Sequence, residues 1–238
     1  MVLAVWWMVR ISELSKAKVG VLSNFTHECV HIVDDDPGAR ESVAALVQSR
    51  GMPSKEYSSA EQFLSVASED LCGCLVLDVR MAGMGGLDLQ EELRHRNIPL
   101  PVIVITGYGD VSAAVRAMQA GAVSFLTKPC QPDELWKAIV EALERCRALR
   151  DVRNRHRTIE QRMSTLTREE RAVLAKVLEG TPNKLIARDL DMGLRTVELR
   201  RSNLMKKMGA ESLAELIQMA LAVGFAKDLP APPSTAVE

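Results

Sequence analysis

This chain of 238 residues lacks the features that would place it in or across a membrane. Its apolar stretch at residues 1–9 falls well short of the roughly 20 residues that a transmembrane helix needs. The same stretch has neither a clear basic start nor a small-residue cleavage site, so it does not fit a signal peptide. We expect residues 1–28 to be a disordered extension, or one produced by a start codon assigned too early. Contact of Trp6 and Trp7 with a membrane surface is the minor alternative.

Cysteine is scarce and is poorly spaced for a metal site. The chain has five cysteines, an odd number, and none of them forms a Cys-x-x-Cys pair. Cys72 and Cys74 are separated by a single residue, which is not the usual spacing of paired zinc ligands. We therefore predict scattered reduced thiols in a cytoplasmic protein.

An overall charge of one sign is also absent, but the charges are unevenly distributed. The formal net charge is −1. Residues 29–144 carry 9 Lys/Arg against 17 Asp/Glu, a balance of −8, whereas residues 145–229 carry 18 against 11, a balance of +7. An acidic half joined to a basic half predicts two domains with different partners, and the basic half is the candidate for binding nucleic acid.

Short apolar runs alternate with helical patterns through the first half of the chain. The apolar runs predict strands at residues 30–34, 53–57, 74–78, 101–106 and 123–127. The patterns between and after them predict helices at residues 37–50, 59–67, 86–95, 111–120 and 132–147. In the helix at 111–120, Val111, Val115 and Met118 fall on one face. Strand–helix alternation with short connections predicts an α/β fold with a doubly wound parallel sheet.

Four of these strands end in residues suited to phosphoryl chemistry, namely Asp34 with Asp35, Asp78, Thr106 and Lys128. Open α/β sheets bind their ligands at the carboxyl ends of the strands, so these side chains should form one site. Mg²⁺ would neutralise the three carboxylates, because it prefers oxygen ligands. We predict Asp78 as the nucleophile that accepts a phosphoryl group and the aspartate pair as the metal clamp, with Lys128 and Thr106 on the phosphoryl oxygens. Taken singly, each residue could instead be a helix cap or a surface charge.

The second half contains only helical patterns. Seven arginines between positions 145 and 162 predict a basic helical linker at 148–163, with a solvated charged face as its default interpretation. Thr167 and Glu170 form a capping-box pattern at the start of a helix. A proline-rich segment at 228–238 is expected to be disordered.

A helix at 183–190, a glycine-containing turn and a helix at 195–208 predict a helix-turn-helix within an all-α four-helix domain. Val197, Leu204 and Met208 should face the core. The opposite face could read base edges in the major groove through Arg195, Glu198, Leu199, Ser202 and Lys206. Phosphate contacts, which position a protein without reading sequence, are predicted for Lys184, Thr196, Arg200, Arg201 and Lys207. The alternative is a solvated charged helix in an ordinary bundle.

Four segments of the first half resemble bacterial response-regulator receiver domains, particularly the FixJ/StyR-like group: VHIVDDD, LVLDVRM, PVIVITGYGD and AMQAGAVSFLTKP. The resemblance implies a flavodoxin-like receiver domain at 29–147 in which a histidine kinase phosphorylates Asp78. It implies that the backbone carbonyl of Arg80 joins the three aspartates as a Mg²⁺ ligand. It also gives Phe125 the position of the switch aromatic, although a plain core aromatic is equally compatible. The family usually has proline where this chain has Ala82.

The stretch LTREERAVLAKVLEGTPNKLIARDLDMGLRTVELRRSNLMKKMGAESLAELIQMAL resembles the LuxR/GerE-type DNA-binding domain over its full length. The resemblance implies a DNA-binding domain at 164–227, with the recognition helix at 194–208 and a dimer contact from the helix at 212–223. Many relatives carry His at the position of Arg200, which weakens the transfer of a phosphate contact to this residue.

Together these patterns predict a two-component transcriptional response regulator, not an enzyme. Phosphorylation of Asp78 would favour a homodimer that reads an inverted repeat of double-stranded DNA, with RNA polymerase as a further candidate partner. One alternative is a constitutive DNA-binding regulator whose receiver does not switch. Another is an aspartate-nucleophile phosphatase, but such enzymes usually carry a second Asp at the position of Arg80.

Overall fold

The computed structural model describes residues 28–107 and 111–225. The chain divides into two compact units, Met1–Leu149 and Arg150–Glu238. The predicted tail at 228–238 and all of the predicted extension except Glu28 lie outside the described residues.

The first unit is built on a parallel sheet with the strand order β2-β1-β3-β4-β5. Its strands are β1 (Cys29–Val33), β2 (Ser54–Tyr57), β3 (Gly73–Asp78), β4 (Val102–Thr106) and β5 (Ser124–Thr127). Its helices are α2 (Pro37–Ser49), α3 (Ala60–Leu64), α4 (Gly86–His95), α5 (Val111–Gln119) and α6 (Pro132–Ser164). The predicted α/β class and parallel sheet are confirmed.

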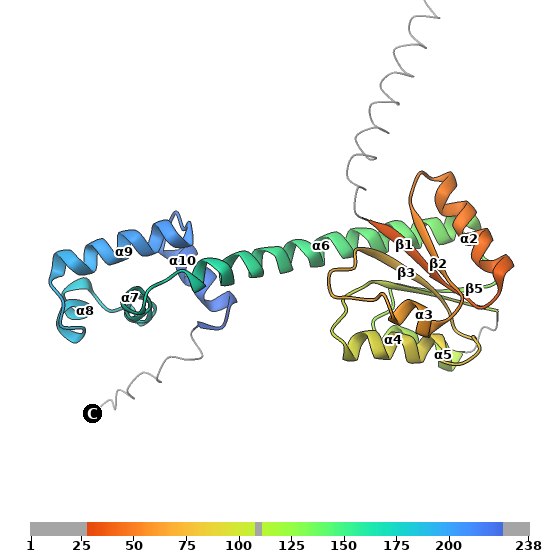
Figure 1. Ribbon diagram of the computed structural model, residues 1–238, viewed down its shortest axis with the longest axis horizontal. Coiled ribbons are helices and arrows are strands. Elements are labelled where there is room, and N and C mark those ends of the chain that lie inside the picture. The colour runs from red at the N-terminus through yellow and green to blue at the C-terminus, as the bar shows by residue number, and fades with distance from the viewer. Residues whose placement is uncertain (1–27, 108–110, 226–238) are drawn as a thin grey trace, which may run out of the picture. The chain divides into compact units, whose positions relative to one another are not determined.

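Both faces of this sheet are covered by helices (Figure 1). Successive side chains of a strand point to opposite faces, so Cys74 and Val76 join the core beneath α2 and α6. Leu75 and Leu77 join the second core, beneath α3, α4 and α5. Burial on both faces explains why these strands are apolar almost throughout.

The helix α5 packs differently from the simple expectation for an amphipathic helix. Its larger apolar residues do share one face, but Val111, Val115 and Met118 are 76%, 48% and 51% exposed. The buried residues are Ala113 and Ala117, whose small side chains let the helix lie close to the sheet. The apolar face of α5 is therefore a surface and not part of the core.

The helix α6 is continuous over 33 residues, so the predicted helix at 132–147 and the predicted linker at 148–163 form one element. Near its middle, Arg147 donates from Nε and Nη2 to the two carboxylate oxygens of Glu28 at 2.8 and 2.7 Å. Glu28 is buried, so it packs with the first unit although we assigned it to the extension.

The second unit contains α7 (Arg168–Leu178), α8 (Asn183–Asp189), α9 (Leu194–Met208) and α10 (Leu213–Ala222). The side chain and backbone of Thr167 form the predicted capping box with Glu170. Val197, Leu204 and Met208 are fully buried in the core of this unit, as predicted. The all-helical architecture is confirmed.

A buried histidine should make the first unit sensitive to acid. The Nδ1 atom of His31 lies 3.1 Å from the hydroxyl of Tyr57, and burial lowers the pKa of its imidazole from 6.5 to about 4. The folded state therefore disfavours protonation, and stability present above the unfolded pKa is lost as the pH falls below it. Between pH 7 and pH 5 this one group should lower the free energy of unfolding by about 2 kcal/mol.

Urea unfolding of wild type and His31→Phe across this range measures the effect. The stability of the variant should fall less steeply than that of wild type as the pH decreases. Parallel curves would mean that His31 does not contribute to the acid sensitivity.

Candidate phosphoryl-acceptor site and DNA-binding surface

The ends of four parallel strands bring the predicted acceptor residues to one edge of the sheet. Asp34 follows β1, Asp78 ends β3 and Thr106 ends β4. Asp78 is paired in register with Ile105, the residue before Thr106, and Thr106 is paired with Thr127, the residue before Lys128. Sequence order and sheet topology together therefore make these residues neighbours.

Lys128 joins the two buried carboxylates. Its Nζ lies 2.5 Å from Oδ2 of Asp34 and 2.7 Å from Oδ1 of Asp78. Asp34 and Asp78 are each only 6% exposed, and Thr106 is 1% exposed. The ammonium group thus offsets the repulsion of two carboxylates that the protein holds together with little water around them.

Burial dominates the electrostatics of Asp78. It raises the pKa of this carboxyl group above its ordinary value, despite the opposing hydrogen bond and charge of Lys128, and the charge of Asp34 adds to the increase. Burial acts on Lys128 in the opposite direction, but its two carboxylate partners outweigh burial and raise its pKa overall. The lysine therefore stays cationic next to a carboxylate that is poorly solvated.

The backbone around the site positions both carboxylates. The amide of Arg80 donates to Oδ2 of Asp78 at 2.6 Å, and the amide of Asp36 donates to Oδ1 of Asp34 at 2.9 Å. The Nη1 atom of Arg40 donates to the carbonyl oxygen of Asp34 at 2.7 Å. We did not predict a role for Arg40, because only the fold of α2 against β1 brings it to this strand end.

Asp35 is oriented differently from the other two aspartates. It is exposed, and its Oδ2 accepts a hydrogen bond of 2.9 Å from the backbone amide of Ala82. Proline has no backbone N–H, so a proline at this position could not make this bond. The departure at Ala82 thus gives the loop after β3 a direct tie to one of the acidic residues.

Oxygen donors at this edge fit a hard divalent cation. Three carboxylates against one ammonium leave an excess of two negative charges, and Mg²⁺ prefers such ligands. In the described ranges, however, no group of three His, Cys, Asp or Glu side chains already has the arrangement of a metal site. The oxygen donors are thus of the type that Mg²⁺ binds. They are not arranged around a common point, because Lys128 lies between Asp34 and Asp78 and Asp35 accepts a hydrogen bond from Ala82.

The first residue of α4, Gly86, approaches the end of β3 closely. A Cβ atom at this position would lie 2.0 Å from the carbonyl oxygen of Asp78. Gly86→Ala should therefore move the backbone of the acceptor and lower the free energy of unfolding by about 1–3 kcal/mol. Gly107→Ala is the matched control, since no described atom lies within 4 Å of its added Cβ. Denaturant unfolding of the two variants checks this, and equal stabilities would contradict it.

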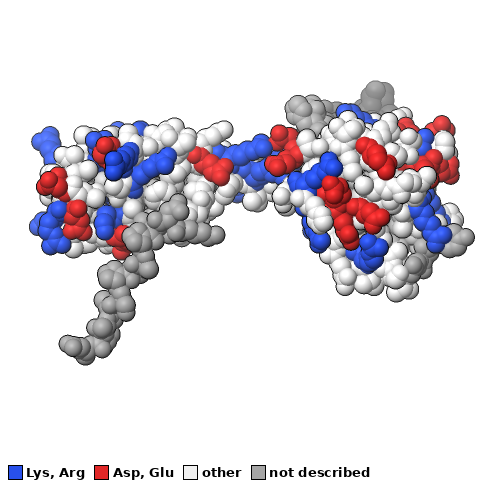
Figure 2. Space-filling model, turned by 60° about the horizontal axis from the view of Figure 1, so that its bottom comes forward, with Lys and Arg blue, Asp and Glu red and all other residues white. Residues whose placement is uncertain are grey.

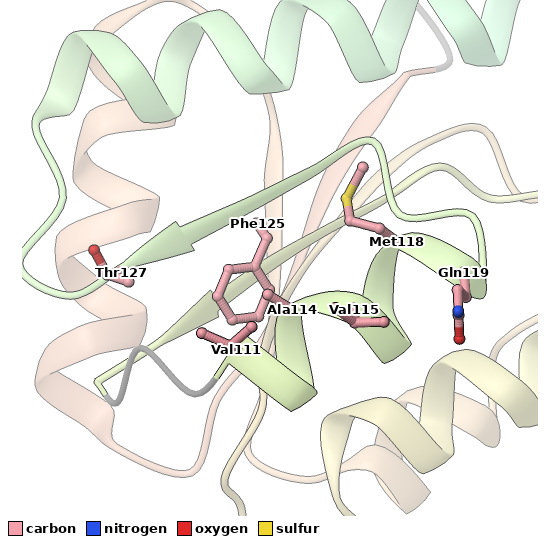
Figure 3. A pocket seen from close by; sticks show the side chains of 7 residues that line it. All are labelled: Val111, Ala114, Val115, Met118, Gln119, Phe125 and Thr127. Atoms are coloured by element: carbon pink, nitrogen blue, oxygen red, sulfur yellow. The ribbon is translucent and has the colours of Figure 1, made fainter.

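An open apolar groove of about 500 Å³ lies between α5 and β5. In Figure 3 the ring of Phe125 lies beside Val111 and Ala114, with Val115 and Met118 further along α5. Phe125 is half-buried: it packs against the second core and also borders the groove beside α5. Its strand leads directly to Lys128, which connects the groove to the acidic site along β5.

The predicted base-reading face of α9 is exposed along its whole length. Exposed side chains on this face are those of Arg195, Glu198, Leu199, Ser202 and Lys206, with Thr196 beside them. Lys184 on α8 is exposed as well. Figure 2 shows blue Lys and Arg side chains both on this unit and along the middle of α6, with red carboxylates between them.

Three of the predicted phosphate contacts also have partners within the protein. Nη1 of Arg201 donates to Oδ1 of Asn183 at 2.6 Å, which braces α9 against α8. Lys207 forms an ion pair of 2.7 Å with the buried carboxylate of Glu170. Arg200 is half-buried. Burial by itself would raise the pKa of the Glu170 carboxyl group, but the hydrogen bond from Lys207 and, to a smaller extent, the charge of Arg200 help to lower it overall. These basic residues therefore hold the unit together as well as contributing positive charge.

Comparison with known proteins assigns each unit to a family. Residues 30–140 match the response regulator receiver domain, and residues 164–220 match the luxR family of bacterial regulatory proteins. The chain belongs to the response regulators that join a receiver to a LuxR-type DNA-binding domain, a family of transcriptional regulators and not of enzymes. This combination implies a histidine kinase and DNA as partners, and receiver domains generally bind Mg²⁺ at their phosphorylation site.

The relatives agree in both domains. The chain is 46% identical to the transcriptional regulatory protein FixJ of Rhizobium meliloti over 200 residues, 84% of this chain and 98% of that protein. It is 40% identical to the response regulator protein TodT of Pseudomonas putida, covering 80% and 84% of the two chains. The solved structure of the response regulator StyR superposes with a TM-score of 0.75 at 38% identity, covering 82% and 99%. The prediction of a FixJ/StyR-like response regulator is confirmed. Among the described helices, none is long and apolar enough to cross a membrane.

Proposed function

We propose that Asp78 is the residue of this regulator that a histidine kinase phosphorylates. The observation that carries the proposal is the shared ion pair of Lys128 with Asp34 and Asp78 at a buried strand edge. A carboxylate that is poorly solvated and held beside a fixed cation is well placed to attack a phosphoryl group. The lysine then faces the charge that develops on the phosphoryl oxygens.

Each neighbouring group has a role in this transfer. Lys128 leaves its pairing with Asp78 to hold a phosphoryl oxygen, and the hydroxyl of Thr106 donates to a second one. The amide of Arg80 orients the Asp78 carboxylate through its hydrogen bond. We assign Asp34, Asp35, Asp78 and the backbone carbonyl of Arg80 as the ligands of Mg²⁺, which when bound neutralises the phosphoryl oxygens.

Phosphorylation should change the surface formed by α5, β5 and α6 and favour a homodimer. Recruitment of Lys128 and Thr106 to the phosphoryl group would pull on the ends of β4 and β5. Phe125 lies on β5 beside the open groove, so it has room to change rotamer as its strand moves. A second copy of the chain is the partner that we propose for this apolar surface.

The dimer would present two copies of α9 to an inverted repeat in double-stranded DNA. Arg195, Glu198, Leu199, Ser202 and Lys206 are assigned to base edges. Lys184, Thr196, Arg200 and Arg201 are assigned to phosphates. RNA polymerase is a further partner in this proposal, and we place the protein in the cytoplasm, where DNA and its kinase domain are accessible.

Beryllofluoride with Mg²⁺, a stable mimic of the phosphoryl group, tests the switch on the full-length protein. We expect the treated protein to become dimeric in sedimentation and to bind a selected inverted repeat more tightly. The same assays without Mg²⁺ are the control. If dimerisation and DNA binding are unchanged by the mimic, the regulator is constitutive and its receiver does not switch.

A further inference from the structure

Two cysteines that are far apart in the sequence meet where the amino-terminal edge of the sheet contacts α6. The Sγ atoms of Cys72 and Cys146 lie 3.9 Å apart. A disulfide bond is about 2.05 Å long, so the sulfurs need to approach each other by about 2 Å. All five cysteines lie in the described part of the chain, and none of them forms a disulfide there. We had predicted scattered thiols from the sequence, but Cys72 and Cys146 form a close pair.

The backbone holds this pair in place. Gly73 has φ +131°, and an added Cβ would lie 1.8 Å from the carbonyl oxygen of Cys29, so only glycine fits between Cys72 and Cys74. The amide of Gly73 donates to Sγ of Cys146 at 3.3 Å, and the carbonyl of Cys72 accepts from the amide of Cys29 at 3.1 Å. The Sγ atom of Cys146 is thus hydrogen-bonded to Gly73, the residue after Cys72. This bond limits how far the sulfurs of Cys72 and Cys146 can separate.

The two thiols differ in access. Cys72 is half-buried, whereas Cys146 is buried, and burial raises the pKa of the Cys146 thiol to about 11 even though the Gly73 amide opposes the shift. A small oxidant should therefore react at Cys72, and Cys146 should act second. Cys74 is fully buried and burial raises its pKa strongly, so it is not a competing target.

We propose that Cys72 and Cys146 are a redox-responsive pair that a hydroperoxide converts into an intramolecular disulfide. In the first step the Cys72 sulfur attacks a peroxide oxygen and the O–O bond breaks, so that Cys72 becomes a sulfenic acid. The departing oxygen takes up the thiol proton and leaves as an alcohol, or as water when the oxidant is hydrogen peroxide. In the second step the Cys146 sulfur attacks that sulfenic sulfur, the S–O bond breaks, and the hydroxyl group leaves with the Cys146 proton as water. The two sulfurs together lose two electrons to the peroxide, and a dithiol reductant reverses the reaction. The bond ties the start of β3 to α6 and does not depend on phosphorylation of Asp78.

Hydrogen peroxide on the folded full-length protein, followed by thiol titration and mass spectrometry without reduction, tests the pair. Wild type should lose two of its five thiols, remain a monomer and yield a peptide that joins Cys72 to Cys146. Dithiothreitol should restore all five thiols. Cys72→Ser, at the more exposed position, should keep its four remaining thiols, and Cys146→Ala should form no internal disulfide.

Cys130→Ser is the matched control, since Cys130 is also half-buried but lies outside the pair. This variant should still lose two thiols at the rate of wild type. The proposal is overturned if the folded wild type keeps five thiols under conditions that oxidise the urea-unfolded protein. It is equally overturned if only one sulfur is oxidised, or if the disulfide joins another pair of cysteines.

Discussion

Replacing Asp78 with alanine should lower phosphoryl incorporation from acetyl phosphate by at least roughly 100-fold, because the substitution removes the proposed nucleophile. Dimerisation and tighter DNA binding in the presence of the phosphodonor should be lost with it. Asp34 is also buried at this strand edge, but it is held by Lys128 and the amide of Asp36 and does not end β3. Labelled phosphoryl incorporation, measured together with sedimentation, checks the expectation.

The fold should survive the loss of this carboxylate. The pKa of Asp78 is raised above its ordinary value, first by burial. A raised carboxyl pKa means that the ionised form costs stability once the pH exceeds the unfolded pKa, so Asp78→Asn should be at least as stable as wild type at pH 7. Asp133→Asn removes an exposed carboxylate paired with Arg50 and should keep full phosphoryl incorporation. A variant at Asp78 that is still labelled as strongly as wild type would move the acceptor to another residue.

Replacing Arg195 with alanine should weaken binding to the selected operator by about 1–3 kcal/mol, roughly 5- to 150-fold, while binding to unrelated DNA changes little. Arg195 is exposed in the first turn of α9, the helix assigned to the major groove, and arginine reads guanine through two hydrogen bonds. Fluorescence anisotropy with both DNAs at fixed salt measures the two affinities.

Lys184→Ala separates base reading from phosphate contact. Lys184 is exposed on α8, and a lysine that contacts a phosphate contributes equally to every sequence. This variant should lower the affinity for both DNAs by the same factor and reduce the slope of log K against log salt by about 1. If Arg195→Ala also lowers the affinity for both DNAs by the same factor, Arg195 contacts the DNA backbone and a different residue of α9 reads the bases.

Much of the acceptor site was predictable because strand ends can be recognised along the chain. Apolar runs ending in Asp34, Asp78 and Thr106 indicate parallel strands, and the carboxyl ends of such strands meet at one edge. The detail of the site was not predictable in the same way. The bond from Ala82 to Asp35 joins two loops, and a pattern within either loop carries no signal for it.

For α5 the sequence predicted the helix correctly but did not predict which of its faces is buried. Periodicity placed Val111, Val115 and Met118 on one face, but could not say whether that face is covered. The structure buries Ala113 and Ala117 instead, so the larger side chains border an open groove. Which face of a helix meets the sheet depends on side-chain packing across elements, and that is decided only when all of them assemble.

Sequence alone determined the two-domain architecture, the parallel sheet, the helix-turn-helix and the residue types at the acceptor site, because each rests on local periodicity or on order along the chain. Tertiary structure alone decided which side chains touch. It brought Lys128 between Asp34 and Asp78, turned Asp35 toward Ala82, and placed Cys72 against Cys146. These contacts join residues 47 to 94 positions apart, and a linear pattern does not encode the distance between atoms on different elements.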